Sequence, residues 1–142
     1  MYYPDLATEC QLGQSLHVRA IGWLERGQEC KRGSIPSNFF DALAKQLESA
    51  WQPVSACGSH YCDLCDSPTY PAHTAAGSRN LFIPTDTHLF IAPELVLHYI
   101  THHQYQPPQQ FIDAVISCPA QESPAYFKLM REHSLGMYQF PD

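Results

Sequence analysis

The sequence predicts an α+β fold: short N-terminal strands and a hairpin with one helix, then three C-terminal helices. Three patterns lead to this prediction. Apolar and polar residues alternate in 15–24, apolar residues recur at helical spacing in 35–51, and three further helical segments follow one another after residue 92. Strands that come before a run of helices are typical of α+β proteins.

The N-terminal half begins with the strand and the helix. Within 15–24 every second residue up to Ala20 is apolar, so we expect a strand with one buried face. In 35–51, Pro36 suits the first helical turn, and Ser34 or Ser37 can cap it. The apolar face of this helix is expected to contain Phe39, Phe40, Leu43, Leu47, Ala50 and Trp51.

The middle of the chain predicts a hairpin between loops. Residues 53–57 suit a short strand, and 66–78, with two prolines and a glycine, suit a long loop. In 80–91, two continuous apolar runs flank the turn-forming residues 84–87, which predicts a hairpin. Because neither run alternates, we expect both strands to be well buried.

Three helices are predicted in the last third. The first spans 93–103, with Pro93 at its first position, and the second spans 108–117. Ser123 can cap a third helix, which Gly136 is expected to end.

Size and charge limit the possible functions. The 142 residues suit one domain over 1–142, in which 1–13 are expected to be irregular. Only eight residues are Lys or Arg and the net charge is −6, which disfavours binding to nucleic acid or to anionic membranes. The first 13 residues lack the pattern of a signal peptide, and no apolar stretch is as long as a membrane span. We therefore expect a soluble, cytoplasmic protein without a membrane partner.

Two short motifs together predict a metal site. Cys62 and Cys65 form a CxxC motif, and His98 and His102 are four residues apart in a predicted helix, where they share one face. Two thiolates and two imidazoles complete a tetrahedral Zn²⁺ site. A zinc ion held by these four residues would pin the helical half of the chain to the strand half.

Other readings of the cysteines remain open. The chain has six cysteines, which in a reducing compartment are thiols or metal ligands rather than disulfides. A redox CxxC normally begins a helix in a thioredoxin-like context, whereas this one runs into a proline-rich loop. Cys57 and His60 are secondary candidates, either as a local cluster with the CxxC or by replacing one ligand. His73 and His103 are weaker candidates.

The ligand set bears on catalysis. Two cysteines and two histidines fill all four positions and leave none for an activated water, so the site would be structural. If one histidine were not a ligand, Glu94 could act as general base of a zinc-dependent hydrolase. The sequence contains none of the HExxH, GxGxxG, P-loop or GxSxG motifs.

Part of the chain resembles a family of small, uncharacterised bacterial proteins. The shared pattern is GxHxCxxC followed by a segment containing HYIxxHxYxPPxxF. The matching residues are Gly58, His60, Cys62, Cys65, Pro93, Leu95, His98, Tyr99, Tyr105, Pro107, Pro108 and Phe111, and the second histidine of the HYIxxH segment falls at the pair His102 and His103. Phe90 stands where the pattern has tyrosine. The resemblance implies no activity, but it points to His60 beside the four expected ligands.

The function predicted from sequence is that of a small zinc-binding protein that serves as a protein-interaction or regulatory module. The alternative is a zinc-dependent hydrolase with an open coordination position, and whether the protein is an enzyme stays open. A third hypothesis is a protein that regulates its partner through an acidic surface. A protein partner fits this composition better than nucleic acid.

Overall fold

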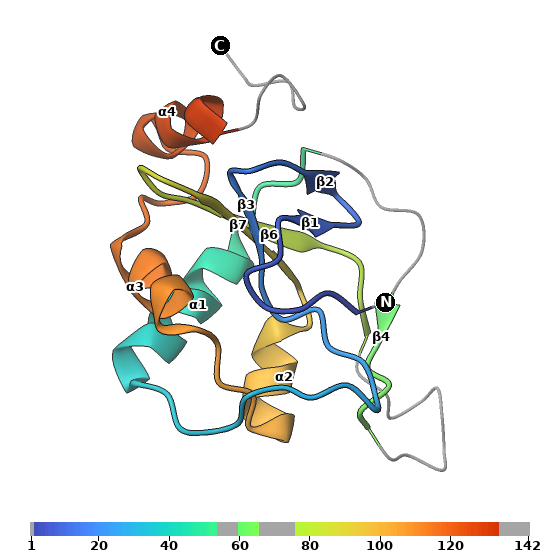
Figure 1. The fold of residues 1–142 in the computed structure, drawn as a ribbon. Helices are drawn as coiled ribbons and strands as arrows, with labels where there is room; N and C mark the ends of the chain where they lie inside the picture. The colour runs from blue at the N-terminus through green and yellow to red at the C-terminus, as the bar shows by residue number, and fades with distance from the viewer. Residues whose placement is uncertain (1, 54–59, 66–75, 134–142) are drawn as a thin grey trace.

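A three-stranded sheet forms the centre of the fold. We describe it from a computed structural model that places residues 2–53, 60–65 and 76–133. β6 (Asn80–Pro84) pairs antiparallel with β7 (Leu89–Pro93), which confirms the predicted hairpin. β3 (Val18–Ala20) pairs with the other edge of β7 and runs parallel to it, so β7 is the central strand (Figure 1).

Both faces of this sheet are covered, which explains the continuous apolar runs of the hairpin. Every residue of β6 and β7 is buried. Because side chains alternate along a strand, Leu81 and Ile83 pack into one apolar cluster, while Phe82 packs into a second one. A hairpin buried on one side would alternate in sequence, and this one does not.

Helices cover the sheet as an α+β fold requires. Within the described residues there are four: α1 (Ser37–Glu48), α2 (Val96–His103), α3 (Gln109–Ser117) and α4 (Pro124–His133). Residues of α1, α2 and α3 share the cluster that contains Leu81. α4 packs with Phe82 in the other cluster, near the turn of the hairpin (Figure 1). No helix in the described part of the chain is long and apolar enough to cross a membrane.

Helix boundaries differ from the predictions where prolines are involved. Pro36 is the N-cap of α1 and no side chain caps that helix, so neither predicted serine does so. Pro93 ends β7 instead of starting α2, because Glu94 and Leu95 first turn the chain. Ser123 does cap α4, since its hydroxyl accepts the N–H of Tyr126 at 3.2 Å. Gly136 lies outside the described residues.

Four two-residue strands complete the described elements: β1 (Glu9–Cys10), β2 (Gly13–Gln14), β4 (His60–Tyr61) and β5 (Ala76–Gly77). β1 pairs with β2, so the segment 1–13 contains regular structure that was not expected. β4 pairs with β5 across the segment that was predicted to be a loop. Of the predicted strand 53–57, all but Pro53 lies outside the described residues.

A glycine after β3 allows the close approach of α2. Gly22 has φ +73°, and a Cβ there would lie 3.0 Å from a methyl carbon of Val96. We expect Gly22→Ala to lower the free energy of unfolding by about 2–4 kcal/mol, because left-handed strain and a clash add together. Urea denaturation measures this loss.

Gly27 offers a matched control for that substitution. Its φ is +91°, but a Cβ there would meet nothing within 4 Å. Gly27→Ala should therefore lose only the strain, about 1–2 kcal/mol. Equal losses in the two variants would show that the contact with Val96 has no energetic effect.

Candidate metal centre

The candidate site forms where the chain leaves β3 and β7. Because these strands are parallel, the residues that follow them emerge at the same edge of the sheet. After β3 the chain passes through Trp23 and Arg26, and after β7 it enters α2. The CxxC turn lies between these two segments, in contact with both. The sheet thus positions both walls of the site.

The CxxC turn follows β4 and is held by Arg26. The backbone N–H of Arg26 lies 3.2 Å from each carboxylate oxygen of Asp63, the residue after Cys62. Its guanidinium donates to the backbone oxygen of Asp63 at 2.7 Å and to that of Cys65 at 3.2 Å. Cys62 is buried and Cys65 half-buried. One arginine therefore fixes the turn to the segment after β3.

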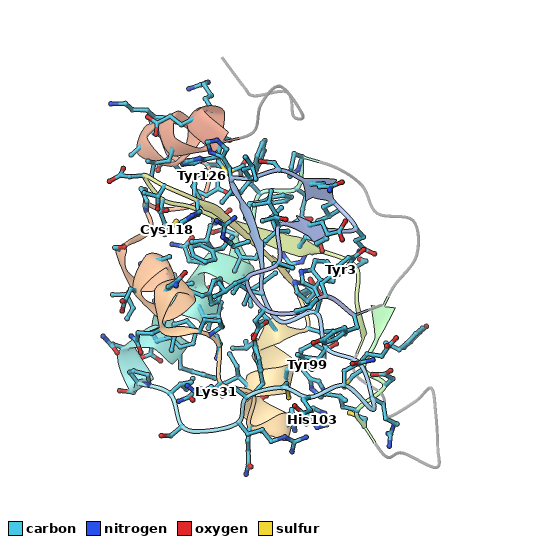
Figure 2. All side chains as sticks on the ribbon, in the orientation of Figure 1. Tyr3, Lys31, Tyr99, His103, Cys118 and Tyr126 are labelled. Carbon is cyan, nitrogen blue, oxygen red and sulfur yellow. The ribbon has the colours of Figure 1, made fainter. Side chains whose placement is uncertain are left out.

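Two histidines of α2 meet these thiols. His98 Nε2 lies 3.2 Å from Cys65 Sγ. His103 Nε2 lies 3.4 Å from Cys62 Sγ and 3.5 Å from Cys65 Sγ. All four candidate ligand atoms lie within 4.8 Å of one another, so Cys62, Cys65, His98 and His103 form a group that could hold a metal ion. Figure 2 shows His103 near the end of α2.

His102, the expected fourth ligand, is not in this group, and His103 takes its place. His102 is exposed, and its ring centroid lies 4.7 Å from that of His98. Helical spacing alone favours His102, because residues i and i+4 share a face. The turn, however, is tied to Arg26, and His103 lies on that side, lining a cavity with Arg26. The direction from which the cysteines approach thus brings His103, and not His102, into the group with the thiols.

The secondary candidates are only partly placed. Cys57 lies outside the described residues, as does His73. His60 belongs to β4, but its side chain is not among those described. The signal that could have favoured His103 is the HYIxxH segment itself, because its second histidine, counted from His98, is residue 103. Nothing in the sequence indicated the role of Arg26.

Burial sets the protonation of the metal-free group. It raises the pKa of the Cys62 thiol to about 11. Burial, together with the nearby His102 and His103, lowers the pKa of His98 to about 4. At neutral pH, Cys62 is therefore a thiol and His98 a neutral imidazole. A metal ion would displace a proton from Cys62 and none from His98.

Glu94, the candidate general base, is engaged elsewhere. Its carboxylate forms an ion pair with Arg79, and the side chain packs against Gly77 of β5. A cavity of about 380 Å³ does adjoin the group, lined among others by His103, Cys30 and Arg32. The described part of that lining contains one carboxylate residue, Glu25.

Comparison with known proteins gives a family but no function. The family model described as "Domain of unknown function (DUF7919)" matches residues 1–116. The matched segment contains all four residues of the candidate metal group and ends before α4. Neither the curated proteins nor the solved structures contain a significant match. Since the match covers well over half of the 142 residues, the chain belongs to the DUF7919 family of domains of unknown function.

Proposed function

We propose that Cys62, Cys65, His98 and His103 bind one Zn²⁺ ion in a closed structural site. The observation that carries this proposal is the convergence of two thiols and two imidazoles from separate elements onto one point. Two sulfur and two nitrogen ligands in a tetrahedral arrangement are typical of structural zinc. The ion would join the CxxC turn to the end of α2.

The distances within the group suit this ion. Zn–S bonds of about 2.3 Å and Zn–N bonds of about 2.0 Å at a tetrahedral angle place sulfur and nitrogen about 3.5 Å apart. The three sulfur–nitrogen separations given above are 3.2, 3.4 and 3.5 Å. In the metal-free chain the same separations allow S–H···N hydrogen bonds, so metal content is the measurement that tests the proposal.

A structural role fits the surroundings better than a hydrolytic one. Four protein ligands leave no position for a metal-bound water. Glu94 is the carboxylate that lies closest in sequence to the histidines and could act as general base, but it forms an ion pair with Arg79. We therefore favour a small zinc-binding interaction or regulatory module with a protein partner over the alternative, a zinc-dependent hydrolase with an open position.

Metal content of the purified protein, with no zinc added, tests the site. We expect about one zinc per chain by elemental mass spectrometry. His103→Ala should lose it, because it removes one of four ligands, whereas the matched variant His102→Ala should retain it. Zinc kept by His103→Ala and lost by His102→Ala would contradict the proposed ligand set, and a metal-free wild type would contradict the proposed function.

The affinity for zinc should rise with pH. Cysteine binds zinc as the thiolate, and burial raises the pKa of Cys62 to about 11, so binding releases the proton of Cys62 near neutral pH. Titration calorimetry in buffers with different ionisation enthalpies counts the released protons. The affinity should fall as the pH is lowered from 8 to 6, and an affinity that is independent of pH would contradict thiolate ligation.

A further inference from the structure

A small cavity beside the metal group has an unusual lining. It measures about 90 Å³ and is lined by Trp23, Leu24, Tyr61, Asp63, Pro93, Leu95 and Tyr99. Among these residues only Asp63 is charged at neutral pH, and no Lys, Arg or His is included. The described lining thus combines aromatic and aliphatic side chains with polar oxygen atoms, and it carries a single negative charge.

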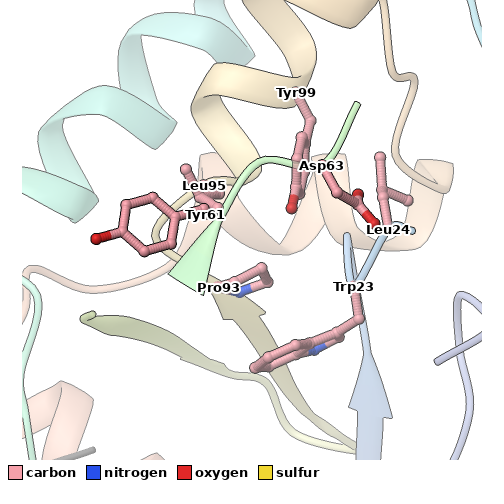
Figure 3. A pocket seen from close by; sticks show the side chains of 7 residues that line it. All are labelled: Trp23, Leu24, Tyr61, Asp63, Pro93, Leu95 and Tyr99. Atoms are coloured by element: carbon pink, nitrogen blue, oxygen red, sulfur yellow. The ribbon is translucent and has the colours of Figure 1, made fainter. Parts of the chain in front are cut away.

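The polar groups at this cavity include two that can accept a hydrogen bond, the Asp63 carboxylate and the Tyr99 hydroxyl. The indole N–H of Trp23 donates to the backbone oxygen of Ile91 at 3.0 Å, so it is engaged away from a ligand. That bond leaves the indole ring to serve as an apolar, electron-rich wall. In Figure 3, the hydroxyl end of Tyr99 and the carboxylate of Asp63 lie on the side of the space opposite Trp23.

The exposure of the lining residues indicates that a ligand can enter this cavity from solvent. Tyr61 and Asp63 are exposed, so solvent reaches the cavity beside them, whereas Trp23 and Tyr99 are only 4% and 5% exposed. The Asp63 carboxylate accepts the backbone N–H of Arg26, whose guanidinium donates to the backbone oxygens of Asp63 and Cys65 and lines the neighbouring cavity.

We propose that this cavity binds an alkylammonium group, with the cation against the indole of Trp23 and its N–H groups donating to Asp63 and Tyr99. A cation is attracted to an aromatic ring and to a carboxylate, and the two attractions reinforce each other here. An anion would be repelled by the Asp63 carboxylate, and a neutral apolar ligand would gain no attraction from it. The net charge of −6 favours the approach of a cation.

If the protein is an interaction module, as proposed above, alkylammonium groups are the class of ligand that this cavity would bind. The inference rests in part on the proposed function, since Asp63 belongs to the turn that zinc would hold. The same chemistry can come from a free amine or from a lysine side chain of a partner protein. Both sources present one ammonium at the end of an alkyl chain.

Nuclear magnetic resonance tests the proposal through the indole N–H signal of Trp23. The probes are n-butylammonium, Nα-acetyl-lysine methylamide and the uncharged 1-butanol. For ligands this small we expect a Kd in roughly the millimolar range. The two ammonium probes should shift the signal saturably, and 1-butanol should bind roughly tenfold more weakly or worse. Tighter binding of the lysine probe would identify a protein lysine as the source, and tighter binding of butylammonium a free amine.

Substitutions separate charge recognition from a general attraction. Asp63→Asn keeps an oxygen for the N–H of Arg26 and should weaken butylammonium binding roughly tenfold. Asp113→Asn, which removes the same charge from an exposed position on α3, should leave the affinity unchanged. Equal binding of 1-butanol and butylammonium, an unaffected Asp63→Asn, or no saturable shift would overturn the proposal.

Zinc content measured on the same samples keeps the two proposals apart. Zinc-loaded protein that does not bind butylammonium refutes the ammonium site and leaves the metal site intact. Protein without zinc that still binds butylammonium with the expected Asp63 dependence supports the ammonium site and refutes the zinc site.

Discussion

Cys62→Ser is expected to remove the zinc and a large part of the stability of the protein. Cys62 is 2% exposed and is one of the two cysteines in the candidate group of the described residues. An ion present at a thousand times its Kd stabilises a fold by about 4 kcal/mol, and structural zinc often binds more tightly than that. Thermal unfolding with and without a chelator measures the effect.

The response to the chelator is the sharper part of this experiment. The wild type should fall to the melting temperature of the variant when zinc is removed, and the variant should not respond. Cys118→Ser is the matched control, because Cys118 is a half-buried thiol outside the group, with a pKa that burial raises to about 12. A wild type whose melting temperature is insensitive to chelation would contradict a structural ion.

Phe111→Ala should cause the second large loss, in the core instead of the site. Phe111 is fully buried, and its ring centroid lies 6.1 Å from that of Phe39 and 5.8 Å from that of Phe90. It thereby joins α3 to α1 and to β7. Removing the ring should lower the free energy of unfolding by about 3–5 kcal/mol, measured by urea denaturation of zinc-loaded protein.

Ile116 provides the comparison within the same helix. It is 44% exposed, so Ile116→Ala should cost less than about 1 kcal/mol. Both variants should keep their zinc, because neither residue belongs to the metal group. A loss at Phe111 as small as that at Ile116 would mean that the three rings do not form a continuous core.

Local patterns in the sequence were enough to predict the elements that carry the fold class. The apolar runs around residues 84–87 predicted the hairpin, and Ser123 predicted the start of α4. What local patterns could not predict is the parallel pairing of β3 with β7, because it joins Val18 to Leu89, far along the chain. Pro93 was predicted to start the helix but ends β7, because a proline suits the first position of a helix and also the end of a strand.

The sequence motifs indicate the residue types of the candidate group better than they indicate its fourth member. CxxC and a histidine-containing helix indicated a four-ligand group, and the structure brings together both cysteines and His98. Spacing along a helix predicts which side chains share a face, but not which face a distant turn approaches. That choice depends on the bonds of Arg26 to the turn at Asp63, a contact with no local signature. Helical spacing therefore favoured His102, whereas the group contains His103.

The parallel pairing of β3 with β7 also has a kinetic consequence. The segment that bears Arg26 reaches the CxxC turn only after strands distant in sequence have met, and such contacts of high sequence separation form slowly. Metal capture would then be a late event in folding, gated by sheet assembly and not by diffusion of the ion. Refolding followed in the presence of zinc should show its rate limited by the chain, with excess zinc slowing unfolding more than it accelerates folding.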